Sequence, residues 1–70
     1  MADSEIIFSV QKSPEGGYEA RALGYSVFTQ AETMDELRRN VREAVHAHFD
    51  GGDSPSVIRL HTVKDEVILA

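Results

Sequence analysis

The chain has 70 residues, of which 41% are hydrophobic and 27% are charged, and its formal net charge at pH 7 is −5. These values are typical of one small folded domain and exclude disorder over most of the length. The chain has no cysteine, which excludes a disulfide framework and a thiolate metal site, and its acidity disfavours general nucleic-acid binding.

Residues 5–12 are expected to form the first strand. Ile6, Phe8 and Val10 alternate there with a second set of positions, which is the period of a strand with one better buried face. We expect these three side chains to face a helix. The following residues 13–17 read SPEGG, and a proline early in a turn with paired glycines predicts a hairpin.

Residues 18–23 are expected to form the second strand, but the sequence leaves its core-facing side open. Tyr18 shares one side with two alanines, whose small size would leave room for a helix, whereas Leu23 on the other side favours the opposite orientation. The next residues are too few for a long loop. A tight turn should therefore lead into a third strand over about residues 26–31.

A helix is expected over about residues 34–49. Thr33 and Glu36 predict a capping box, in which the threonine oxygen accepts from the third helical amide and the glutamate reaches back to the cap amide. Gly51 is a natural terminator. One apolar stripe with helical spacing consists of Met34, Leu37, Val41, Ala44, Val45, His48 and Phe49.

Residues 50–56 are expected to form a loop, because glycines, short oxygen-bearing side chains and a proline follow one another there. A C-terminal strand region follows over residues 57–69. We favour a break near Lys64 and Asp65, which would leave a fourth strand before it and a short fifth strand over residues 67–69. One long bent strand is the alternative.

Three antiparallel strands, a helix and a further strand predict an α+β two-layer sandwich of β-β-β-α-β order, in one domain spanning residues 1–70. The third strand runs parallel to the first. A right-handed crossover through the helix therefore lays the fourth strand beside the first and parallel to it, with the sheet order 3-2-1-4. The helix covers one face of this sheet.

The three histidines are the classical metal ligands of this chain apart from its carboxylates. His46 and His48 point to nearly opposite sides of the expected helix, so they cannot share one ion. His48 can meet His61 only if the fourth strand passes under the helix end. No carboxylate pair and no Ser, His and acid arrangement follows a recognisable pattern. We therefore expect no catalytic residue, no cofactor and no metal site.

The arginines of the expected helix do not require a nucleic-acid partner. Arg39 belongs to a ladder of alternating charge with Asp35 and Glu43, which is typical of an exposed helix. Arg38 falls inside the apolar stripe, so its stem should lie along the core edge with its guanidinium reaching water or a carboxylate. We expect no direct contact with nucleic acid.

Two segments resemble the HicB-like antitoxin family, GGYEA at residues 16–20 and FTQAETMDELRRNVREAV at residues 28–45. That family carries a Gly-Gly-Tyr hairpin, a strand ending in Thr-Gln-Gly or similar, a Thr-x-x-Glu cap and an amphipathic helix with a Glu-Ala pair. The match covers about residues 6–62. The resemblance implies a partly degraded RNase H-like fold of the same element order. It also implies a domain that blocks a small HicA-type RNase toxin and often self-associates.

The chain departs from the family pattern in two places. Residues 22–26 make a bare short turn where family members usually carry a Pro-Asp-Leu-Pro-Gly-Cys-like loop. The sequence stops at Ala70, where full antitoxins continue into a DNA-binding domain, so we do not expect operator binding. Nuclease activity is not expected either, because residues 6–11 lack the central aspartate that would hold catalytic magnesium.

We therefore expect a non-enzymatic protein-interaction domain resembling a HicB-type antitoxin, an orphan that binds a small RNase toxin or self-assembles. The alternative is a small enzyme or ligand binder that uses the open sheet face. A chain of this size buries only about 60% of its unfolded surface, and strands three and four are sheet edges that favour pairing. We expect a homodimer with contacts at Val27, Phe28, Val57, Arg59 and His61.

A cytoplasmic location is expected from the same sequence. No segment has the length and apolar character of a membrane span, so no membrane partner is expected. The acidic opening at residues 1–5 lacks the basic and apolar parts of a signal peptide.

Overall fold

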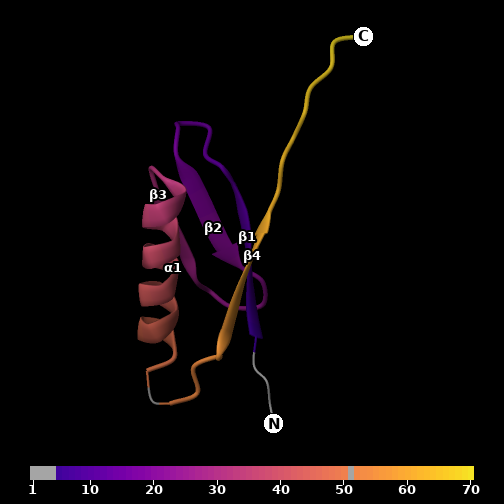
Figure 1. Ribbon diagram of the computed structural model, residues 1–70. Helices are drawn as coiled ribbons and strands as arrows, with labels where there is room; N and C mark the ends of the chain where they lie inside the picture. Colours follow the sequence, from indigo (N-terminus) through magenta and orange to yellow (C-terminus); the bar gives the residue numbers. More distant parts are fainter. Residues whose placement is uncertain (1–4, 51) are drawn as a thin grey trace.

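The computed structural model describes residues 5–50 and 52–70. Its elements in chain order are β1 (Glu5–Lys12), β2 (Tyr18–Ala22), β3 (Phe28–Ala31), α1 (Met34–His48) and β4 (Val57–Thr62). The strands form one sheet in the order β3-β2-β1-β4, with β1 parallel to β4 and the other two pairs antiparallel. The helix packs on one face of this sheet (Figure 1). The predicted α+β fold and its strand order are confirmed.

The centre of the core lies between β1 and α1. Because alternate residues of a strand point to opposite faces, one set of β1 side chains lies under α1. The six largest fully buried side chains, each at most 1% exposed, are Ile6, Phe8 and Val10 of β1 and Leu37, Val41 and Val45 of α1. The predicted face of the first strand and the centre of the predicted helical stripe are therefore confirmed.

The structure decides the orientation of the second strand, which the sequence left open. Ala20 and Ala22 are buried on the helix side, whereas Leu23 follows the strand and is 55% exposed. Tyr18 packs against the edge of the core. The small alanine side chains let α1 approach the sheet closely, so β2 presents its alanine face to the helix.

The hairpin between β1 and β2 depends on its paired glycines. Gly16 and Gly17 have positive φ angles of 100° and 81°, and the amide of Gly16 donates to the carbonyl of Ser13 at 3.0 Å. A Cβ atom at Gly17 would lie 2.6 Å from the carbonyl oxygen of Ala31, whereas one at Gly16 would meet no atom within 4 Å. The backbone of β3 therefore approaches the hairpin where only glycine fits.

The helix starts at the predicted cap, with one difference. Thr33 Oγ1 accepts from the amide of Glu36 at 3.1 Å, as expected. The Glu36 carboxylate, however, accepts from the amide of Glu32 at 3.3 Å and not from that of Thr33. The backbone of Thr33 is extended. The amide of Glu32 therefore lies within reach of the Glu36 side chain. The expected terminator Gly51 lies outside the described residues.

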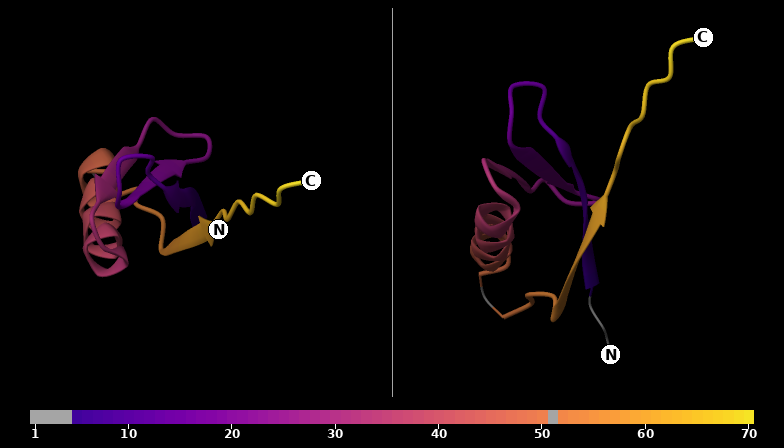
Figure 2. Two further views of the ribbon diagram at one scale, coloured as in Figure 1. Left: turned by 90° about the horizontal axis from the view of Figure 1, so that it is seen from above. Right: turned by 45° about the horizontal axis from the view of Figure 1, so that its top comes forward.

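β2 ends at Ala22 and β3 begins at Phe28, so both strands are shorter than expected, and one expected strand is absent. Val27, which precedes β3, lies in the core, where it is 6% exposed. The expected fifth strand over residues 67–69 is not formed. The amide of Val63 still donates to Val10, but the chain then leaves the sheet (Figures 1 and 2). β4 is an edge strand, so the residues beyond the end of β1 have no neighbouring strand with which to pair.

We predict that Leu37→Ala lowers the free energy of unfolding by about 2 to 4 kcal/mol, because it leaves a cavity under the helix. Arg39→Ala, at an exposed position of the same helix, is the matched control and should change stability by less than about 0.5 kcal/mol. Denaturant melts of the two variants measure the difference. Equal effects would contradict the assignment of the buried stripe.

The two hairpin glycines provide a second test. Gly16→Ala should cost about 1 to 2 kcal/mol through its positive φ alone. Gly17→Ala should cost clearly more, because its new methyl group also meets the backbone of β3. Thermal unfolding of both variants measures the extra loss, and a smaller loss at Gly17 than at Gly16 would contradict the close approach.

Candidate functional site

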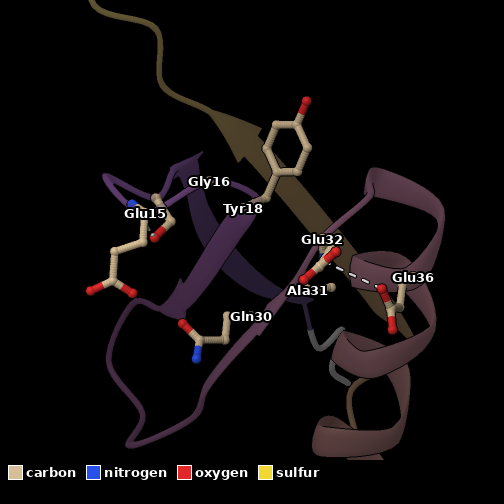
Figure 3. A pocket seen from close by; sticks show the side chains of 8 residues that line it. Glu15, Gly16, Tyr18, Gln30, Ala31, Glu32 and Glu36 are labelled. Atoms are coloured by element: carbon tan, nitrogen blue, oxygen red, sulfur yellow. Dashed lines mark hydrogen bonds between the residues drawn. The ribbon is translucent and has the colours of Figure 1, made fainter.

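An open cavity of about 380 Å³ lies where the β1–β2 turn, the end of β3 and the first turn of α1 meet. Figure 3 shows the hairpin residues on one side of it and the residues of the helix start on the other. Its lining is mainly polar and consists of Ser13, Glu15, Gly16, Tyr18, Gln30, Ala31, Glu32 and Glu36. Such a lining differs from the mostly apolar pockets that hold small organic ligands.

The carboxylates of Glu15, Glu32 and Glu36 make this cavity acidic. Glu36 is held in place by the Glu32 amide (Figure 3), and the amide of Glu15 donates to Ser13 Oγ at 3.4 Å within the hairpin turn. Within residues 5–50 and 52–70, none of the three carboxylates makes an ion pair, and no basic side chain lines the cavity. We name this surface the acidic cavity.

The chemistry of the acidic cavity is that of exposed negative charge. In the part of the chain that the structure describes, no three His, Cys, Asp or Glu side chains are placed to hold a metal ion. No polar or charged side chain is fully buried there either. The arrangement therefore suits charge-assisted hydrogen bonds to basic groups of a partner.

The expected contact residues of the fourth strand lie together. Val57, Arg59 and His61 belong to β4 and face away from the helix, since they stand opposite β1 residues of the uncovered face. Arg59 forms an ion pair with Glu5. Val57 is 49% exposed, so this part of the uncovered face is accessible.

The other two expected contact residues are placed differently. Phe28 is exposed on the uncovered face with the Arg21 guanidinium 4.9 Å from its ring centroid, but β3 and β4 form opposite edges of the sheet. Val27 is buried in the core of its own chain. Val27, which was also expected in the contact, thus lies beneath the surface of its own chain, and Phe28 is separated from the β4 residues by β2 and β1.

The histidines are kept apart by the two faces of the sheet. His61 faces away from the helix, so it does not meet His48 at the helix end. His48 instead packs edge-to-face with Phe49 and Tyr25, at ring-centroid distances of 4.8 Å and 6.0 Å. The contact of Tyr25 with the helix end has no signal in the sequence, because it joins distant segments.

The helix contains an ion pair that differs from the pairs expected in the ladder of alternating charge. Arg38 bonds to Asp35 at 2.7 Å, and the two side chains are 56% and 91% exposed. Asp35 thus pairs three residues along the helix and not with Arg39 at four. The guanidinium of Arg38 reaches a carboxylate from the edge of the core, as predicted.

Two relatives define the family of this chain. A UPF0150 protein of Archaeoglobus fulgidus is 46% identical over 52 residues, which are 74% of this chain and 77% of that protein. A UPF0150 protein of Thermotoga maritima is 41% identical over 64 residues, which are 91% of this chain and 90% of that protein. The chain belongs to the UPF0150 family. No family model matches it, and no solved structure matches it.

The name of these UPF0150 relatives states no activity, ligand or partner. Across the described residues of this UPF0150 protein, no helix is both long and apolar enough to traverse a bilayer.

Proposed function

We propose that this UPF0150 protein is a non-enzymatic interaction domain of the HicB antitoxin type, which binds and blocks a small RNase toxin of the HicA type. The position of the resembling segments carries the proposal. Residues 16–20 contribute Gly16 and Tyr18 to the acidic cavity, and residues 28–45 contribute the lining from β3 and the helix start. The two segments that carry the resemblance therefore meet at one surface.

The charge of this surface supports the same partner. An RNase that binds the phosphates of RNA needs basic side chains along its substrate path. Glu15, Glu32 and Glu36 offer exposed carboxylates without basic neighbours in the cavity. Binding at the acidic cavity would place these carboxylates on the basic surface of the toxin and exclude RNA from it. Complementary charge also accelerates the encounter of two proteins.

The proposal predicts that the triple variant Glu15→Gln, Glu32→Gln, Glu36→Gln binds the toxin about tenfold more weakly, since each exposed ion pair contributes about 0.2 to 1 kcal/mol. The probe is a purified small basic RNase toxin of the HicA type, made inactive by substitution of its catalytic histidine. Isothermal titration calorimetry at two salt concentrations measures Kd. Glutamine at residue 36 keeps an oxygen that accepts from the Glu32 amide, so the helix start is preserved.

A matched control changes the same net charge elsewhere. The control is the triple variant Glu19→Gln, Glu43→Gln, Asp50→Asn, whose three positions lie outside the acidic cavity. It should keep the Kd for the toxin within about twofold of the wild-type value. Absence of toxin binding, or equal losses in both triple variants, would overturn the proposal. Turnover of RNA with magnesium by the purified domain, abolished by one carboxylate substitution, would favour the alternative of a small enzyme.

A further inference from the structure

A different open cavity, of about 370 Å³, lies where β2, β1 and the end of β4 meet. Its surface is mainly apolar, unlike that of the acidic cavity, and none of its lining residues is acidic. An apolar lining with a few polar groups is the composition of sites that hold small organic molecules, which have volumes of about 300 to 1,000 Å³. We name this cavity the lysine pocket. It is lined by Val10, Gln11, Lys12, Tyr18, Thr62, Val63 and Lys64.

The strand register brings four of these side chains to one face of the sheet. Lys12 stands opposite Tyr18 in the β1–β2 pair, and Thr62 stands opposite Val10 in the β1–β4 pair. Val10 is fully buried on the helix side, and Lys12 follows it by two residues on the same strand, so both belong to that face. Because α1 lies against β3 and β2, it leaves the β1 and β4 part of this face open.

The lysine pocket gathers both lysines of the chain. The sequence has 12 acidic residues and 7 lysines and arginines, and lysine occurs only at residues 12 and 64. Both lysine side chains are exposed. Within residues 5–50 and 52–70, neither of them forms an ion pair. Two ammonium groups beside an apolar surface give this part of an acidic chain a local preference for an anion.

We propose that the lysine pocket binds a small amphiphilic anion, which has an apolar body and one carboxylate or phosphate head. The head lies between Lys12 and Lys64, whose ammonium groups act as point charges toward either kind of anion. The apolar body packs on Val63 and on the ring of Tyr18, where binding removes apolar surface from water. This inference does not depend on the proposed antitoxin function.

Tyr18 lies at the border between the lysine pocket and the acidic cavity. It lines both cavities, and it is partly buried (Figure 3). On one side of it an anion is attracted by the two lysines. On the other side an anion is repelled by Glu15, Glu32 and Glu36. The two cavities therefore select opposite charges, and the ligand is oriented with its head toward the lysines.

A nuclear magnetic resonance titration of the isotope-labelled chain tests the class of ligand. The probes are octanoate, octyl phosphate and neutral octanol, which share one apolar body. At least one anion should give saturable shifts of the Gln11, Thr62 and Val63 amides, with a Kd at least about fivefold below that of octanol. The anion with the lower Kd identifies the preferred head. The proposal is overturned if octanol binds as tightly as both anions, or if neither anion shifts these amides saturably at millimolar concentration.

Removal of charge tests the two lysines. Lys12→Gln with Lys64→Gln should raise the Kd for the preferred anion about fivefold, because the head loses both ammonium groups. Arg39→Gln with Arg42→Gln makes the same change of net charge at exposed helix positions outside the lysine pocket, and it should keep this Kd within about twofold. Equal losses in the two double variants would reveal a general effect of net charge and would overturn the proposal.

Val63→Ser tests the apolar wall of the lysine pocket. The Val63 amide donates to the carbonyl of Val10, and serine keeps this backbone bond. The variant should raise the Kd for the preferred anion about threefold, because the apolar body loses a contact. Val67→Ser, at an exposed position outside the lysine pocket, is the matched control and should leave the Kd unchanged. An unchanged Kd in Val63→Ser would also overturn the proposal.

Discussion

The packing of one helix on one sheet face is the constraint on which the rest of this protein depends. Leu37, Val41 and Val45 meet the inner side chains of β1, and this is where the domain hides its largest apolar groups from water. α1 lies against β3 and β2. A single helix of 15 residues is too narrow to cover four strands equally, so the outermost strand β4 keeps a half-covered flank.

The same packing determines on which face of the sheet the polar side chains lie. Because successive strand residues alternate between faces, fixing Ile6 and Phe8 under the helix sends Arg59 and His61 to the uncovered face. The chain has few buried positions to offer, and among the described residues its charged groups remain at the surface. Its candidate site is therefore an exposed charged surface suited to a macromolecular partner, and not an enclosed pocket for a small molecule.

The acidic cavity and a second groove beside α1 are separate surfaces. The acidic cavity is formed by the hairpin, β3 and the start of α1. The groove of about 300 Å³ is formed by the middle of α1 and the opposite edge of the sheet, and is lined by Arg38, Val41, Arg42, Ile58 and Leu60. No lining residue belongs to both.

Local patterns in the sequence determined the elements of this protein. Alternation in β1, the Gly16–Gly17 turn, the Thr33 cap and the apolar spacing of α1 are short-range signals, and they also led to the correct strand order. Only the tertiary structure decided which face of β2 is buried, because the approach of the helix favours its alanines. It also decided that residues 64–70 form no strand, because most of them lie beyond the end of β1, the strand with which β4 pairs. The acidic cavity was missed because Glu15 is distant in sequence from Glu32 and Glu36, and only folding brings them together.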